Sequence, residues 1–129
     1  MHKQGEKKKL NKIDPKECNV PNVNFSLVSD NDKRGAQFKK QRLERGFDES
    51  ETWSLDYTIA CFIAPRLKEF IEIYKKVIVD DCGLVPKAER ALKAFEKIAE
   101  GETVWKEDEY NEITEALKGF AEIFLGLWW

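Results

Sequence analysis

Histidine is almost absent from this chain: His2 is the only one among its 129 residues. The sequence therefore excludes Ser-His-Asp and Cys-His catalysis, zinc sites built on histidine, and the usual general base of neutral pH. The phosphate-binding patterns Gly-x-x-x-x-Gly-Lys-Ser/Thr and Gly-x-Gly-x-x-Gly do not occur either. We expect a protein that is not an enzyme and that holds no cofactor and no metal.

Cysteine and long apolar runs are also scarce. Cys18, Cys61 and Cys82 are an odd number at unrelated spacings, which does not indicate a disulfide framework. The longest apolar run, residues 59–65, is too short to span a bilayer, and the basic N-terminus lacks the apolar stretch of a signal peptide. We expect a cytoplasmic protein that does not contact the membrane.

The densest apolar pattern lies in residues 46–76. Asp48 and Glu51 match an acidic capping box at a helix start. From Trp53 onward, apolar residues recur at helical spacing on two opposite stripes, which is typical of a helix buried between neighbours. This stretch predicts a long central helix.

Pro65 interrupts that predicted helix. Proline cannot donate a hydrogen bond to the carbonyl of Cys61, and its ring crowds that carbonyl. A kinked long helix and a helix–turn–helix are both compatible with the pattern. We favour the kink, since no glycine or turn residue accompanies the proline.

Three further helices complete the predicted fold. A short one runs from the caps at residues 30–32 to Arg45, a second covers 86–100, and the last runs from about 106 or 107 to Leu127. The predicted fold is all-α, a small helical bundle around the long Pro-kinked central helix.

The N-terminal part has a different composition. Residues 1–29 are predicted to form a basic, mostly disordered arm, and residues 30–129 a single helical domain. Val23, Phe25 and Leu27 alternate, which permits a short extended piece that docks on the helical body or on a neighbouring subunit.

Charge is distributed unevenly along the chain. Residues 1–46 hold twelve Lys/Arg against six Asp/Glu, a net charge of +6, whereas residues 47–129 hold ten against eighteen, a net of −8. The basic segment either neutralises the acidic body of its own chain or of a subunit, or it forms an anion-binding surface. In the second case the segment 33–45 would bind nucleic acid.

Trp128 and Trp129 follow directly on the apolar face of the last predicted helix. Two exposed indoles would form an adhesive surface, so they either close the core or make a subunit contact. A small core has limited room for four tryptophans. We expect a homo-oligomer, most simply a dimer.

Asp56 is the most informative single acid. Its spacing places it on the face of Trp53 and Ala60, where a carboxylate needs a partner. It either forms a buried pair with an arginine or accepts a hydrogen bond in a ligand pocket. The residues predicted to form this site are Arg42, Arg45, Trp53, Asp56, Tyr57 and Arg66.

Part of this region also resembles a known family. The acidic cap after Gly46, Trp-Ser-Leu-Asp at 53–56 and Pro-Arg-Leu-Lys at 65–68, with the tryptophan-containing acidic stretch at 102–107, are similar to small proteins encoded by tailed bacteriophages. The resemblance covers roughly residues 45–127. It implies a phage origin and an all-helical fold, and it carries over no activity and no catalytic residue. For a phage protein, the cytoplasm expected above is that of the host cell.

Together these features predict a binding protein that performs no catalysis. It would inhibit a host protein or sequester a charged small ligand such as a nucleotide. The alternative is an accessory protein that binds nucleic acid through residues 33–45.

Overall fold

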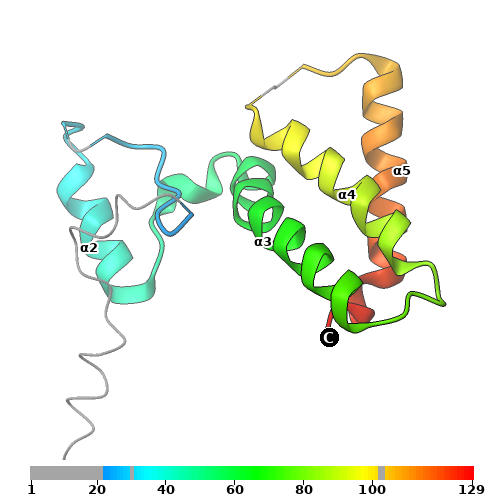
Figure 1. Cartoon of the computed structure of the whole chain (residues 1–129). Helices are drawn as coiled ribbons and strands as arrows, with labels where there is room; N and C mark the ends of the chain where they lie inside the picture. The colour runs from blue at the N-terminus through cyan, green and yellow to red at the C-terminus, as the bar shows by residue number, and fades with distance from the viewer. Residues whose placement is uncertain (1–21, 30, 102–103) are drawn as a thin grey trace, which may run out of the picture. The chain divides into compact units, whose positions relative to one another are not determined.

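The chain is helical throughout the part that the structure describes. This is a computed structural model, and it describes residues 22–29, 31–101 and 104–129 (Figure 1). Four α-helices and two 3-10 helices occur there, and no strand does. They are α2 (Gly35–Arg45), η2 (Glu49–Thr52), α3 (Leu55–Val77), α4 (Leu84–Ala99), α5 (Glu107–Ile123) and η3 (Phe124–Gly126). The predicted all-α fold is confirmed, while residues 1–21 of the predicted arm lie outside the described residues.

The chain divides into two compact units, Met1–Leu55 and Asp56–Trp129. The sequence suggested a division elsewhere, between an arm at 1–29 and a single domain at 30–129. The last residues of that arm contact Ser50, because the backbone N–H of Leu27 donates to its Oγ at 2.9 Å. Ser26 and Leu27 thus contact η2 within the first unit, and the division into an arm and a single domain stays a prediction.

Helix α2 ends as the sequence predicts. Gly46 has a φ of 86°, in the left-handed region that glycine adopts without a steric penalty, and its N–H donates to the carbonyl of Arg42 at 2.8 Å. Phe38, a residue of this helix, is buried. Helix α2 thus has eleven residues, ends before a glycine and buries one apolar side chain.

The predicted capping box at Asp48 and Glu51 is confirmed, but it begins a different element. It caps the 3-10 helix η2, and a turn at residues 53–54 separates η2 from α3. The central helix therefore begins at Leu55, and Trp53 precedes it. The predicted helical register from Trp53 to Asp56 is wrong for this reason.

Helix α3 runs without a break through Pro65, so the helix–turn–helix alternative is wrong. Pro65 is exposed, whereas Ala64 and Leu67 on either side of it are buried in the core. The missing N–H thus costs one hydrogen bond to Cys61, while the packed stripe holds the helix together. The kink at this proline stays a prediction.

The core of the second unit is shared by α3, α4 and α5. Its members on α3 are Ala60, Ala64, Leu67, Ile71 and Tyr74, and those on the other two helices are Leu84, Val85, Ala88, Ala91, Phe95 and Phe120. The rings of Phe95 and Phe120 meet edge to face at 5.3 Å between centroids. The second apolar stripe predicted for α3 is about half exposed, at 48% for Ile59 and 49% for Phe62. The sequence pattern therefore overestimated how far the second stripe of α3 is buried.

Helix α4 begins at Leu84, two residues before the predicted start at Pro86. The Asp80 carboxylate accepts from the backbone N–H groups of Leu84 at 2.8 Å and Val85 at 3.0 Å. These bonds satisfy donors that the first turn of a helix leaves unpaired. In the described ranges, no helix is both long enough and apolar enough to cross a membrane.

Candidate functional site

The predicted site residues are distributed over both units. Arg42, Arg45 and Trp53 belong to the first unit, and Asp56, Tyr57 and Arg66 belong to α3 of the second.

Arg42 is held by Asp48. The Arg42 guanidinium donates to the Asp48 carboxylate, with Arg42 8% exposed and Asp48 fully buried. Asp48 also accepts from the backbone N–H of Ser50 at 2.8 Å and from its hydroxyl at 2.5 Å. The buried Asp–Arg pair that the sequence predicted for Asp56 is thus formed by Asp48.

The surroundings of Asp48 and Glu51 shift their acidity in opposite directions. Burial alone would raise the pKa of Asp48, but hydrogen bonds from Ser26, Ser50 and Arg42 outweigh it and lower that pKa below its ordinary value. Burial raises the pKa of Glu51, although its carboxylate accepts from the backbone N–H of Asp48 at 2.7 Å. The ion pair is therefore held in its charged form beside an acid that loses its proton less readily.

The hydrogen bonds around Asp48 and Ser50 connect three segments of the first unit. The hydroxyls of Ser26 and Ser50 lie 3.3 Å apart, and Arg42 comes from α2. Asp48 and Ser50 lie at the start of η2. This Asp48 cluster (Ser26, Arg42, Asp48, Ser50 and Glu51) is a structural centre, because its polar atoms are turned toward one another.

Trp53 has one face covered by its own unit. The guanidinium carbon of Arg34 lies 5.0 Å from the centre of the indole, and the Phe38 ring meets the indole edge to face at 5.9 Å. Arg34 is in turn fixed by two hydrogen bonds to Asp32, at 3.0 and 3.1 Å. An incoming ring therefore cannot stack on that face of Trp53 without displacing Arg34.

Arg45 is likewise engaged within the first unit. It donates to the carbonyl of Phe47 at 3.1 Å and to Gln41 Oε1 at 3.2 Å, and its guanidinium lies 4.4 Å from the centre of the Phe47 ring. These bonds leave the positive charge exposed without a carboxylate partner among the described residues. Arg45 therefore contributes to a basic surface and not to a pocket.

The three predicted residues on α3 do not form a buried group. Asp56 is exposed, which corrects the expectation that it lies on the buried face. Tyr57 is half-buried, and a hydrogen bond with Cys61 raises the pKa of its phenol. Arg66 donates to the carbonyl of Phe62 at 2.7 Å and stacks on the Phe62 ring at 4.0 Å.

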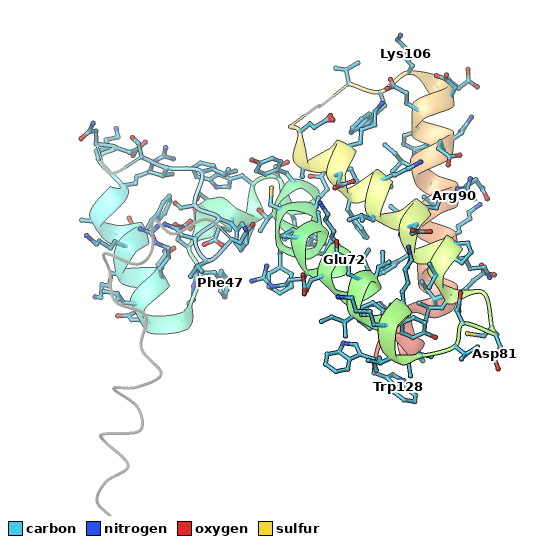
Figure 2. All side chains as sticks on the ribbon, in the orientation of Figure 1. Phe47, Glu72, Asp81, Arg90, Lys106 and Trp128 are labelled. Carbon is cyan, nitrogen blue, oxygen red and sulfur yellow. The ribbon has the colours of Figure 1, made fainter. Side chains whose placement is uncertain are left out.

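A groove that the sequence did not indicate lies between α4 and α5. Its volume is about 270 Å³, and charged side chains from both helices line it above Ala94, Ile113 and Ala116. Arg90, labelled in Figure 2, lies on its α4 side. The basic residues at 90, 93 and 97 lie three or four apart, and Glu112 lies four residues after Asp108 and three after Glu109, which was the available signal.

The second unit also presents an apolar surface at its C-terminal end, formed by Phe124, Leu125, Trp128 and Trp129. These side chains are 56%, 89%, 71% and 60% exposed. Leu127 between them packs against the core, and η3 lies against α4, where a Cβ at Gly126 would be 3.6 Å from Leu84. Figure 2 shows Trp128 on the outside of the unit. In this chain the two indoles do not close the core.

Within the described residues, no group of three or more His, Cys, Asp or Glu side chains could hold a metal ion. Comparison of the chain with protein-family models, curated proteins and solved structures gave no match. The resemblance to bacteriophage proteins stays a prediction.

Proposed function

We propose that this protein acts by binding other macromolecules, without catalysis of its own, and that its C-terminal apolar surface is a protein-binding surface. The observation that carries the proposal is the exposure of Phe124, Leu125, Trp128 and Trp129. The two indoles alone expose roughly 200–300 Å². Apolar surface of this kind on a folded unit is typical of interaction sites.

The occupant proposed for this surface is a second copy of the chain. Stable interfaces bury roughly 800 Å² per partner, so the four side chains would form the centre of a larger contact. Two copies related by a two-fold axis bring the same surface together from both sides. The opposing effect is charge: residues 56–129 hold ten Lys/Arg and fifteen Asp/Glu, a net of −5 per copy, so association should strengthen as salt screens that repulsion.

Sedimentation measures this proposal directly. The full chain at tens of micromolar should sediment above the 15.0 kDa of one copy, and the variant Trp128→Ala/Trp129→Ala should return to that mass with its helicity unchanged. Tyr110→Ala is the matched control, because Tyr110 is an aromatic residue on α5 with the same 60% exposure as Trp129. A full chain that sediments at the mass of one copy would contradict self-association.

A second candidate is nucleic-acid binding by the basic segment 33–45. The supporting observation is that Lys33 and Lys39 are exposed and form no ion pair with any residue that the structure describes. Phosphate contacts weaken by orders of magnitude between roughly 50 and 200 mM salt. Fluorescence anisotropy with labelled DNA and RNA should therefore show salt-sensitive binding.

The variant Lys33→Gln/Lys39→Gln should reduce both the affinity and the steepness of its salt dependence. Lys118→Gln, which removes a lysine paired with Glu115 in the acidic second unit, should leave both unchanged. If neither nucleic acid binds at about 50 mM salt, where phosphate contacts are strong, this candidate is wrong.

A further inference from the structure

The groove between α4 and α5 is built from two diverging helices. Figure 1 shows α4 and α5 separating toward the loop that joins them, and the groove occupies this side of the pair. Ala94 and Ala116 are buried at its base, and Ile113 completes the apolar floor. Because each alanine contributes only a methyl group, a volume of about 270 Å³ stays unfilled.

Opposite charges face each other across this floor. The cations Arg90, Lys93 and Lys97 come from α4, and the acids Asp108, Glu109 and Glu112 come from α5. Arg90 donates twice to Glu112, at 2.8 Å in each case, and Lys97 pairs with Glu109. Two ion pairs therefore join the two walls of the groove.

One charge of each sign is left over. Lys93 forms no ion pair with the residues that the structure describes. Asp108 accepts a hydrogen bond at 3.0 Å from the backbone N–H of Glu109 and pairs with no cation among the described residues. Both side chains line the groove. The groove thus offers a donor and an acceptor of opposite charge above an apolar floor.

We propose that this groove binds a small zwitterion with an apolar side chain, such as a free α-amino acid. The Lys93 ammonium donates to the ligand's carboxylate, and the Asp108 carboxylate accepts from its ammonium group. Such charge-assisted hydrogen bonds are stronger than neutral ones. The ligand's side chain covers Ala94, Ile113 and Ala116, as in small-molecule sites where a few polar groups orient a ligand over an apolar surface.

The charge layout disfavours ligands of a single sign. A simple anion would meet Lys93 but also the acids at 108, 109 and 112, and a simple cation would meet the bases at 90, 93 and 97. A zwitterion presents each end to the opposite charge. The site does not depend on the C-terminal surface, so the two proposals fail independently.

The experiment titrates L-leucine into the ¹⁵N-labelled full chain and follows amide resonances by NMR. Resonances of Lys93, Ala94, Asp108 and Ile113 should shift and saturate together. The analogues 4-methylpentanoate, which lacks the ammonium group, and 3-methylbutylamine, which lacks the carboxylate, should bind at least tenfold more weakly. Even modest binding efficiency gives a ligand of leucine's size a Kd of roughly 10 mM, so no saturable shift at that concentration overturns the proposal.

Single-residue variants then test what each side chain of the groove contributes to leucine binding. Lys93→Gln and Asp108→Asn should each weaken leucine binding at least tenfold, while Lys118→Gln, whose lysine pairs with Glu115 on α5, should bind as the parent does. Ala94→Leu should abolish binding by filling the floor. If Ala94→Leu fails to fold, the two charge variants still decide, and unchanged affinity in both overturns the proposal. Trp128→Ala/Trp129→Ala should bind leucine normally, whatever its mass in solution.

Discussion

The Asp48 carboxylate joins two elements of the first unit, α2 and η2. It receives hydrogen bonds from Arg42 and from the backbone and hydroxyl of Ser50, and it is fully buried. Arg42 is also buried, and its Nε has no hydrogen-bond partner among the residues that the structure describes. Removing one member of a buried ion pair leaves the other charge without water or a counter-ion. Such a change therefore lowers the free energy of unfolding strongly.

We predict that Asp48→Ala lowers the free energy of unfolding of the first unit by roughly 3–5 kcal/mol, because it leaves the Arg42 guanidinium buried and unpaired. Hydrogen exchange of α2 amides in the native protein measures this opening. Asp56→Ala is the control: Asp56 is exposed in the first turn of α3, and it should cost less than about 1 kcal/mol. Equal costs for the two variants would contradict the assignment of the buried pair to Asp48.

Acid should act on the first unit in two opposite phases. Glu51 has a raised pKa, so protonating it favours the folded state, and stability should rise as the pH falls from neutrality toward its unfolded value of about 4.3. Asp48 has a lowered pKa, so its contribution is present above about 3.9 and is lost as the pH falls through the folded value below that. The pKa of Asp32 is lowered to about 2 by hydrogen bonds from Arg34, which adds to the loss at the acid end.

Urea titrations at several pH values, followed by NMR signals of α2, should therefore show highest stability near pH 4–5. Glu51→Gln should remove the rise on acidification and keep the loss below about pH 3.9. A monotonic decline of stability from pH 7 in the parent protein would be inconsistent with the raised pKa of Glu51.

For single residues, the sequence correctly predicts interactions between residues that are close together in the chain. The capping box joins Asp48 and Glu51, which lie three positions apart in the chain, and it was predicted correctly. The choice of Asp56 as the buried acid failed because helical spacing was counted from Trp53, whereas a turn at 53–54 breaks the register before α3. The groove was not predicted, because its existence depends on how far two helices diverge over Ala94 and Ala116.

Among the elements, α4 shows how a preceding loop fixes a helix start. No side chain at the N-cap residue Gly83 can accept a hydrogen bond, so the Asp80 carboxylate reaches forward to the N–H groups of Leu84 and Val85. The rule that proline favours the first helical position placed this helix two residues too late. Its apolar face and its end near Gly101 followed directly from the periodicity.

Asp80→Ala should lower the stability of the second unit by about 1 kcal/mol, in the range measured for lost helix caps. Asp81→Ala is a matched control, since Asp81 is the exposed neighbour and the two bonds to the first turn of α4 come from Asp80. Thermal unfolding followed by circular dichroism compares the two. Equal midpoints for both variants would show that the bonds from Asp80 contribute nothing to stability.

For the molecule as a whole, the two units are stabilised differently. Among residues 22–29 and 31–55, the buried apolar side chain is Phe38, and buried polar groups supply the rest. The second unit buries thirteen apolar residues in the described part of the chain. Because apolar burial is the main stabilising term in folding, the first unit should be the weaker one.

Unfolding of the full chain should therefore not be two-state. In a urea titration, NMR signals of α2 should disappear at a lower concentration than those of α4 and α5. Circular dichroism should show a first transition that accounts for the shorter helix α2 and a second for the longer helices. A single midpoint for signals from both units would contradict this order.

The Asp48 cluster also limits how the sequence can change during evolution. Arg42 and Asp48 come from different elements, yet each is tolerable in the interior only while the other is present. A lineage cannot lose one of them alone without passing through a poorly folded ancestor, so the two positions should change together or not at all. An alignment of relatives should show Arg42 and Asp48 replaced jointly by a neutral pair, whereas exposed Asp56 should change independently of both.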